Sequence, residues 1–278
     1  MNAFRKLLAI SLVFTLVQCN IWDGDKVSGE GPVVTKNIKI DDFNSIEVSN
    51  GWRVELIPNQ SPQMIAKANQ NLIDILEVKE SNGKLSIGAK ENIGSADSKL
   101  IKIYFNKNLK LIKASSGGEL TAEEKLIFGS TKIGASSSAD IELNIKADLL
   151  EVEGSSESEI KLTANSSELK VNASSSADIS IKGENKILNA SASSGAEIEL
   201  TGMSENVEFK ATSGSDIDAE DLESKKVKAK ASSGASIDCY PLDQLKATAS
   251  SGANIRYHNN PSKNISSQST SGGSIKKD

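Results

Sequence analysis

Aromatic residues are scarce in this chain of 278 residues, at 4% of the composition, and there is a single histidine, His258. Both features are unusual for an enzyme, because histidine is the commonest acid–base catalyst and aromatic side chains commonly line substrate pockets. Charged residues make up 25% of the chain, but both signs are interspersed and no run of basic residues occurs. The sequence therefore lacks the cluster of positive charge that nucleic-acid-binding proteins use. Hydrophobic residues, at 37%, suffice for a core of isoleucine, leucine, valine and alanine.

Cysteine is also rare, with only Cys19 and Cys239, so stability must come from packing rather than from disulfides. Cys19 follows a segment with the layout of a targeting signal, a positively charged start and then an apolar run over residues 7–17. That run is too short to span a bilayer, which needs about 20 residues. We therefore assign residues 1–18 to a signal peptide.

The tetrapeptide LVQC at residues 16–19 resembles a bacterial lipobox, although Gln18 replaces the small residue usual before the cysteine. The resemblance implies lipid attachment at Cys19, and therefore an anchor in the cell envelope, at the outer membrane or the cell surface. An ordinary secretory signal with an incidental cysteine is the alternative. A lipidated Cys19 leaves Cys239 without an intrachain disulfide partner. Residues 19–32 are rich in glycine and aspartate, and we expect them to form a flexible tether.

A nonapeptide recurs through residues 114–278. It reads ASSSADIEL at residues 135–143, ASSSADISI at residues 173–181 and ASSGAEIEL at residues 192–200. Nine copies follow one another at intervals of 18 to 21 residues. They begin at Ala114, Ala135, Gly154, Ala173, Ala192, Ala211, Ala231, Ala249 and Ser269.

The positions of the nonapeptide alternate in character. The first and fifth positions are always small, the third is serine in every copy, and the seventh is isoleucine except for Leu120. Even positions are mostly polar, which is the period of a β-strand with one buried face. An aliphatic residue four positions before most copies extends the alternation backwards. Each unit therefore predicts two short strands joined by a corner of small residues.

One such unit cannot bury its apolar face alone, whereas stacked units share a core. Parallel pairing between successive coils predicts an all-β fold, a right-handed parallel β-helix of about nine coils. Equivalent residues would lie above one another at about 4.8 Å, so the seventh positions would form an isoleucine ladder. Glycine at the fourth position, as at Gly195 and Gly214, suits a corner with positive φ. This regularity argues against disorder, the alternative for a chain rich in serine and glycine.

Residues 33–113 also alternate, but in longer segments punctuated by turn signals such as Asn82-Gly83. This part contains Trp52, and residues 88–98 have the composition of an exposed loop. We expect a β-rich unit that begins the solenoid or caps its first end.

The order of these segments resembles the head GIN domain family, which is described as auto-transporter adhesins. The likeness rests on FNSIEV at residues 43–48, NGKLSI at residues 82–87, LKLIKASSGGEL at residues 109–120 and the SSGAEI units that follow. It covers roughly residues 33–278 and implies an elongated right-handed β-helix on a secreted or envelope protein. The family brings no catalytic residues to carry over.

Carboxylates recur at the sixth position of the nonapeptide. The column consists of Glu119, Asp140, Glu159, Asp178, Glu197 and Asp216. Stacked like charges repel, and bound Ca²⁺ would offset that repulsion. The preferred alternative is a solvated face that keeps the sheet from pairing with others, with Lys161 softening the repulsion. We therefore predict no metal site and no cofactor.

Candidates for catalysis are few. The third-position serines could be nucleophiles, but no activating group lies near them, so we expect them to hydrogen-bond at the corner. We expect His258 in a surface loop and Cys239, at an inward ninth position, in the core. Polysaccharide-active β-helix enzymes set carboxylates beside cationic and aromatic contacts, and the sequence indicates no such cluster. The prediction is a protein that is not an enzyme, with a polysaccharide-active enzyme as the alternative.

We expect a lipid-anchored β-helix of the cell envelope that adheres to or recognises a macromolecule, either a host or matrix component or a glycan. A purely structural envelope protein is a further alternative, and no nucleic-acid partner is expected. The segment SGGSIKKD at residues 271–278 provides no evident cover for the last coil. Unpaired strand edges can pair with another chain, so a homo-oligomer is a further alternative to a monomer.

Overall fold

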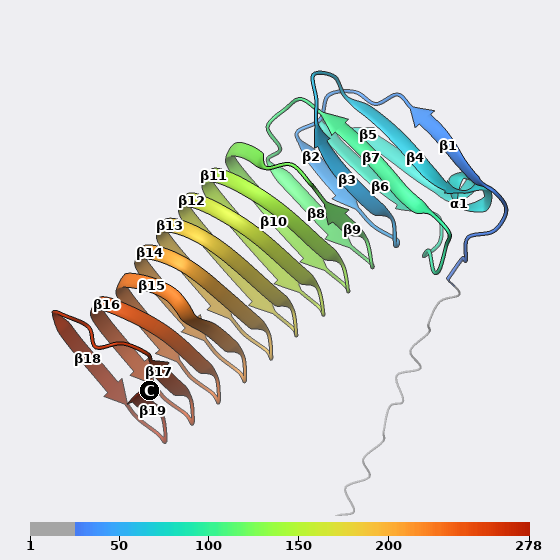
Figure 1. The fold of residues 1–278 in the computed structure, drawn as a ribbon. Helices are drawn as coiled ribbons and strands as arrows, with labels where there is room; N and C mark the ends of the chain where they lie inside the picture. The colour runs from blue at the N-terminus through green and yellow to red at the C-terminus, as the bar shows by residue number, and fades with distance from the viewer. Residues whose placement is uncertain (1–25) are drawn as a thin grey trace, which may run out of the picture.

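The computed structural model describes residues 26–278 as a long β-solenoid with a β-rich unit at its N-terminal end (Figure 1). The expected signal peptide and Cys19 fall within residues 1–25, outside the described residues. Parallel pairing of successive coils confirms the predicted solenoid, while its right-handed sense stays a prediction. Among the described elements, no helix is long and apolar enough to cross a membrane.

The N-terminal unit combines antiparallel and parallel pairs. It contains β1 (Val33–Ile38), β2 (Ser45–Val48), β3 (Arg53–Pro58), β4 (Gln63–Asn69), α1 (Gln70–Ile75), β5 (Leu76–Ser81), β6 (Lys84–Ala89) and β7 (Lys99–Phe105). β4 lies antiparallel between β1 and β7, whereas β2 and β3 pair in parallel with β8 (Leu111–Ser115) and β9 (Glu119–Thr121). Trp52 is fully buried and donates its indole N–H to the carbonyl of Gly88 at 2.9 Å. The unit therefore continues the sheet of the first coil and covers that end.

Residues 26–32, the described part of the expected tether, lie along this unit. The N–H of Val27 donates to the carbonyl of Asn92 at 2.8 Å, and the N–H of Gly29 donates to Ser95 at 2.7 Å. The side-chain amide of Asn69 also donates to the carbonyl of Gly31 at 3.0 Å. This stretch is therefore part of the folded unit and not free chain.

Most coils of the solenoid consist of one long, bent strand where the sequence predicts two short ones. The strands are β10 (Leu126–Ser136), β11 (Asp140–Ser155), β12 (Glu159–Ser174), β13 (Asp178–Ala192), β14 (Glu197–Ala211), β15 (Asp216–Ala231), β16 (Ser236–Ala249), β17 (Asn254–Tyr257), β18 (Asn264–Ser269) and β19 (Ser274–Lys277). In β11 the alternation of buried and outward residues continues through Ile145 and Ala147. Two successive outward residues, Asp148 and Leu149, then interrupt it. The strand turns there without losing its pairing to the next coil.

The predicted isoleucine ladder is present. Ile160 pairs with Ile141 in the preceding coil and with Ile179 in the following coil, and Ile179 pairs with Ile198. Each of these side chains is at most 2% exposed. Burial of each is worth about 1.5–3 kcal/mol, so the ladder is a principal source of stability.

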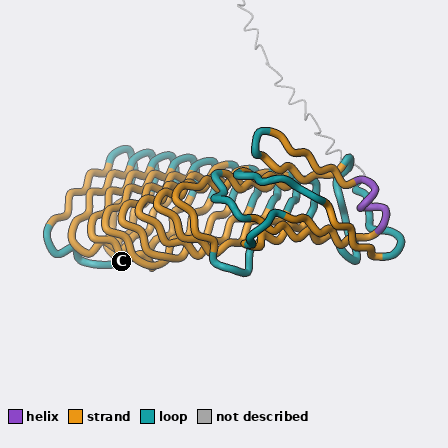
Figure 2. The backbone as a smooth tube through the Cα atoms, turned by 90° about the horizontal axis from the view of Figure 1, so that it is seen from above, coloured by secondary structure: helices purple, strands orange, loops and turns teal. Residues whose placement is uncertain are grey.

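The small-residue corner is a tight turn whose two central residues both have positive φ. In the turn after β13, Ser194 has φ 54° and Gly195 has φ 70°, and the N–H of Ala196 donates to the carbonyl of Ser193 at 3.2 Å. This pattern is that of a type I′ turn. The same turn recurs in every coil, so the turns line up along one edge of the rod (Figure 2).

The third-position serines therefore do not lie in the interior, contrary to the simple odd-in, even-out pattern. Ser194 and its equivalents are exposed turn residues, and the flanking first and fifth positions, such as Ala192 and Ala196, are buried instead. The turns are linked by backbone bonds between coils, for example from the N–H of Gly195 to the carbonyl of Ser213 at 3.2 Å. The backbone, and not a ladder of hydroxyl groups, holds this edge together.

Candidate binding surface

Each long strand contributes to two opposite walls of the rod. The residues before the bend form one wall, and the residues after it form the other. The interior between the walls is thin: a methyl group on Gly154 would lie 3.1 Å from Cδ1 of Ile179 in the facing wall. We call the outward surface before the bend the acidic face and the outward surface after the bend the opposite face. Both faces present straight columns of side chains because the coils pair in register.

The acidic face contains the predicted column of carboxylates. Asp140 pairs with Glu119 on one side and Glu159 on the other, and Asp178 pairs with Glu197. Burial and then repulsion from Glu159 raise the pKa of Asp140. Burial and then repulsion from Asp178 raise the pKa of Glu197 in the same way. The column is therefore a source of electrostatic strain at neutral pH.

Residues 26–278 contain no group of three or more histidine, cysteine, aspartate or glutamate side chains placed to hold a metal ion. The Ca²⁺ alternative thus has no geometric support within that part of the chain. The ammonium group of Lys161 contacts Glu159, in keeping with the expected softening of the repulsion.

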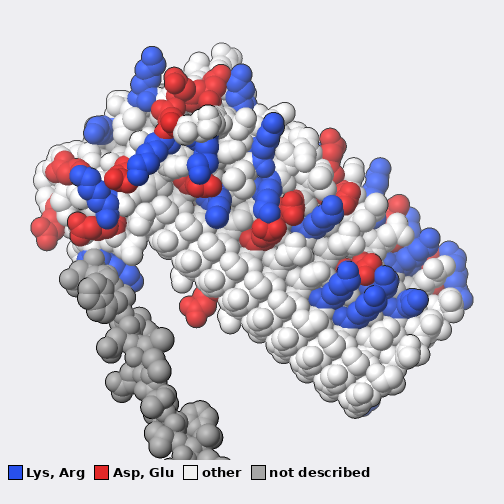
Figure 3. Space-filling view, turned by 180° about the vertical axis from the view of Figure 1, so that it is seen from behind, with Lys and Arg blue, Asp and Glu red and all other residues white. Residues whose placement is uncertain are grey.

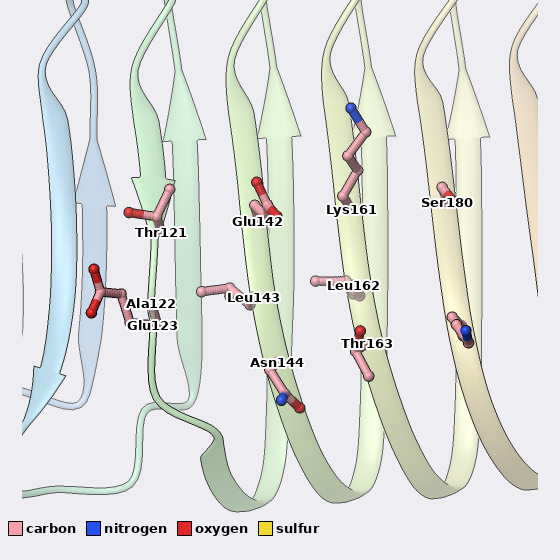
Figure 4. A pocket seen from close by; sticks show the side chains of 11 residues that line it. Thr121, Ala122, Glu123, Glu142, Leu143, Asn144, Lys161, Leu162, Thr163 and Ser180 are labelled. Atoms are coloured by element: carbon pink, nitrogen blue, oxygen red, sulfur yellow. The ribbon is translucent and has the colours of Figure 1, made fainter.

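A shallow groove crosses the acidic face over four successive coils (Figure 4). Leu143 and Leu162, which are 3% and 5% exposed, lie between its two polar rows. The rows consist of Thr121, Glu142, Lys161 and Ser180, and of Asn144, Thr163 and Lys182. This mixture of hydroxyl, amide and charged groups can donate and accept hydrogen bonds along a ligand that runs parallel to the rod.

The opposite face has a different charge. Its first coils present lysines and glutamates that pair with one another, as Lys132 does with Glu153 and Lys170 with Glu168. In contrast, β14, β15 and β16 present mostly lysines near the C-terminal end of the rod (Figure 3). We call this cluster the lysine patch, and it consists of Lys210, Lys226, Lys228, Lys230 and Lys246. Glu208 is the acid within it, and its Oε1 lies 3.3 Å from Nζ of Lys210 and 3.0 Å from Nζ of Lys228.

A third feature is an ion cluster where β16 and β17 meet. Arg256 donates from Nε and Nη2 to the two carboxylate oxygens of Asp238 at 2.6 and 2.8 Å. Nε2 of His258 lies 3.2 Å from the same carboxylate and 3.5 Å from Glu220, and its Nδ1 lies 3.5 Å from Asp278. The sequence-based expectation that basic residues form no cluster with the acids is therefore wrong at this site, although His258 does lie in a loop.

The environment of Asp238 favours its ionised form. Its side chain is only 7% exposed, and that burial opposes ionisation, but the hydrogen bonds from Arg256 and His258 outweigh it and lower the pKa of Asp238. A carboxylate held in this way accepts hydrogen bonds and is a poor proton donor near neutral pH.

The remaining candidate residues are Cys239, the third-position serines and Cys19. Cys239 is fully buried, as expected of a core thiol, and burial raises its pKa to about 12. Within residues 26–278, the hydroxyl groups of the third-position serines take part in no hydrogen bond or ion pair. The corner hydroxyls that do bond backbone groups are those of Ser158 and Ser215, at the fifth position. Cys19 lies in the part that is not described.

The lysine patch and the ion cluster are both absent from the sequence-based prediction. A local signal for the patch exists in SKKVKAK at residues 224–230, where alternate lysines fall on one face of a strand. No comparable signal joins Asp238 to His258, because they come together only through the stacking of successive coils.

Comparison with known proteins agrees with this architecture. The family model described as "Putative auto-transporter adhesin, head GIN domain" matches residues 42–183 and 163–261. No curated protein matches the chain.

Several solved structures share the fold. A "Putative lipid binding protein" from Parabacteroides distasonis superimposes with a TM-score of 0.69 at 23% identity, over 91% of this chain and 100% of that chain. A "putative adhesin" from Parabacteroides merdae gives a TM-score of 0.69 at 24% identity, over 91% of this chain and 99% of that one. A second "putative adhesin" from Parabacteroides distasonis gives 0.69 at 19% identity, over 91% and 100%. Since the family model covers most of the sequence, from the first parallel strands to the last long coil, the chain belongs to the head GIN domain family.

Proposed function

We propose that this protein is a lipid-anchored component of the cell envelope that holds a macromolecule on the outside of a rigid rod, without changing it chemically. The observation that carries the proposal is the register of the outward columns, which repeat identically spaced side chains over successive coils. Such a surface suits a long or repetitive ligand, because each coil offers a similar set of contacts. The family description as an adhesin supports the same role.

The anchor is proposed at Cys19, on the lipobox-like residues 16–19. Cells that express the full chain and are fed a palmitate analogue should label the wild-type protein and not Cys19→Ser. Cys239→Ser should keep the label, because that thiol is fully buried in the fold. Absence of label on the wild type would remove the anchor from the proposal.

The binding role is tested by screening the full chain on arrays of glycans and matrix proteins, followed by a turnover assay on each ligand that is retained. Retention of an intact ligand supports adhesion. Silence on every array would favour a purely structural envelope protein and contradict the proposal.

A polysaccharide-active enzyme is the second candidate, and the ion cluster is the observation that favours it. Arg256 and His258 both lie within hydrogen-bond distance of the Asp238 carboxylate, so that a cation and an imidazole flank one carboxylate. Acid–base cleavage of a glycan requires groups of these types. Degradation of a retained glycan that is lost in His258→Gln, while binding persists, would establish this alternative in place of adhesion.

A further inference from the structure

The lysine patch lies on the opposite face, where β14, β15 and β16 run side by side. We propose that it binds a linear acidic polysaccharide, one that carries carboxylate or sulfate groups at regular intervals. The inference rests on the proposed binding function and specifies the class of ligand and the surface that holds it.

The patch brings like charges together with little internal compensation. Lys210 pairs directly with Lys230 of the next coil, and Lys228 pairs directly with Lys246 of the coil after that. Like charges in directly opposed positions destabilise a sheet. A bound anion would turn this repulsion into attraction.

Glu208 neutralises only part of the positive charge of the lysine patch. It bridges Lys210 and Lys228, and its hydrogen bond with Lys228 is the main reason that the pKa of Glu208 is lowered. Lys226, Lys230 and Lys246 are exposed, and within residues 26–278 no carboxylate lies within ion-pair distance of them. Three ammonium groups are therefore free to meet an external anion.

The spacing of the patch suits a polymer better than a small anion. The lysines lie on neighbouring coils about 4.8 Å apart and on alternate residues of a strand about 6.6 Å apart, so they form a flat grid. No enclosed cradle surrounds any single ammonium group, because all five side chains stand on the outer surface of a sheet. A chain with repeated anionic groups can contact several of them at once.

The surroundings favour a hydroxyl-rich ligand over a protein. A shallow groove runs through the patch, and amides flank the lysines in it, namely Asn189, Asn206, Gln244 and Asn264. Amides donate and accept hydrogen bonds, as sugar hydroxyls require. The lining of this groove contains no aromatic residue, although aromatic anchors dominate protein–protein contacts. Nucleic-acid bases would also lack a stacking platform there.

The remainder of the molecule limits how the polymer can bind. The chain has a formal net charge of −5, and the acidic face lies on the far side of the thin rod. General attraction of a polyanion to the protein is therefore absent, and binding must depend on contacts made at the patch. Such binding weakens with added salt in proportion to the number of ion pairs formed.

The test measures binding of the full chain to heparin, to polygalacturonate and to neutral dextran over a series of salt concentrations. The variant Lys226→Gln/Lys230→Gln/Lys246→Gln removes the three unpaired charges. The matched control Lys36→Gln/Lys67→Gln/Lys125→Gln makes the same change in net charge at exposed lysines elsewhere in the fold. We expect at least one acidic polysaccharide to bind at low salt, and the patch variant to bind it at least about ten-fold more weakly, with a salt slope smaller by about three. The control should bind as the wild type does.

Several results would overturn the inference. They are no binding to either acidic polymer at low salt, equal loss in the control and the patch variant, or tighter binding to duplex DNA or to vesicles of anionic phospholipid than to either glycan. Self-association that the patch variant abolishes would assign the surface to a second copy instead. If the arrays retain a ligand that the patch variant still binds, the inference fails while the proposed function stands. If they retain nothing, the proposed function fails as well.

Discussion

The guanidinium of Arg256 in β17 donates two hydrogen bonds to the carboxylate of Asp238 in β16, at 2.6 and 2.8 Å, and so joins two successive coils near the C-terminal end. Arg256→Gln would leave a carboxylate that is 7% exposed with His258 as its main partner. We expect the free energy of unfolding at pH 7 to fall by about 1–3 kcal/mol, the usual result when a buried polar group loses its partner. Urea denaturation measures this change.

The matched control is Arg53→Gln, which breaks the more exposed pair with Glu119 and should cost about 0–1 kcal/mol. The Asp238 effect should also depend on pH. Because the pKa of Asp238 is lowered from 3.8 in the folded protein, its contribution is present above that value and is lost as the pH falls through the folded pKa. Equal losses for the two arginine variants would contradict a special role for Arg256.

The isoleucine ladder predicts a graded loss of stability. Ile179→Ala should lower the free energy of unfolding by about 2–5 kcal/mol, and Ile179→Val by about 0.5–1.5 kcal/mol, because each leaves a cavity between rungs. Ile187→Ala, at a side chain that is 44% exposed on the opposite face, should change it by less than about 0.5 kcal/mol. If Ile179→Ala behaved like Ile187→Ala, the side chain could not be part of a dry core.

Two glycines should respond very differently to alanine. Gly214 has φ 70° in a turn with open space around it, so Gly214→Ala should cost only the conformational penalty of about 1–2 kcal/mol. A methyl group on Gly183 would collide with the carbonyl oxygen of Ala164 in the preceding coil. Gly183→Ala must therefore displace backbone, and we expect a larger loss in thermal unfolding by circular dichroism. Similar melting temperatures for the two variants would show that the coils do not approach so closely.

The acidic column predicts that stability rises when carboxylates are removed. Asp140→Asn/Glu197→Gln should raise the free energy of unfolding at pH 7 by about 0.2–1 kcal/mol per site, whereas Glu91→Gln, in an exposed loop, should not. The pKa values of Asp140 and Glu197 are raised in the folded protein from 3.8 and 4.5, so the ionised side chains destabilise the fold at neutral pH. This destabilisation disappears as the pH falls through the folded-state pKa values and the carboxylates become protonated.

Melting temperatures at pH 7 and pH 5 test this dependence. The wild type should gain more than the double variant on acidification, because the two carboxylates are the only groups in which the proteins differ. An unchanged or lower melting temperature for the double variant at pH 7 would mean that the column is well solvated or has a bound counter-ion.

The fold is predictable from this sequence because its information is periodic. Alternation identifies which side chain at each position faces inwards, and the interval between copies identifies which residues stack, so the pairing of Ile160 with Ile179 follows directly. The turn is harder to predict, because serine rarely adopts positive φ and a single unit would favour glycine. In the protein, Ser194 holds φ 54° where bonds between the turns of successive coils fix the backbone.

The proposed binding surface, the lysine patch, is less predictable because it depends on which columns of different coils become neighbours. Lys226 and Lys230 are close in sequence, but Lys210 and Lys246 join them only when three coils stack. The contact of His258 with Asp238 likewise spans one coil, and no property of either residue indicates it. A residue type that recurs at the same position of every copy can be assigned to a face of the rod from the sequence. A residue that occurs in only one or two copies can be matched with its neighbours only in the three-dimensional structure.

Because the coils stack in register, the length of the rod can change independently of its cross-section. Ile141, Ile160 and Ile179 follow one another at intervals of 19 residues, and each stacks on the equivalent residue of the next coil. Duplication of a gene segment that encodes one such interval would lengthen the reach of the rod while preserving its cross-section. A lineage could in this way adjust how far the protein extends from the proposed anchor without redesigning the proposed binding surface.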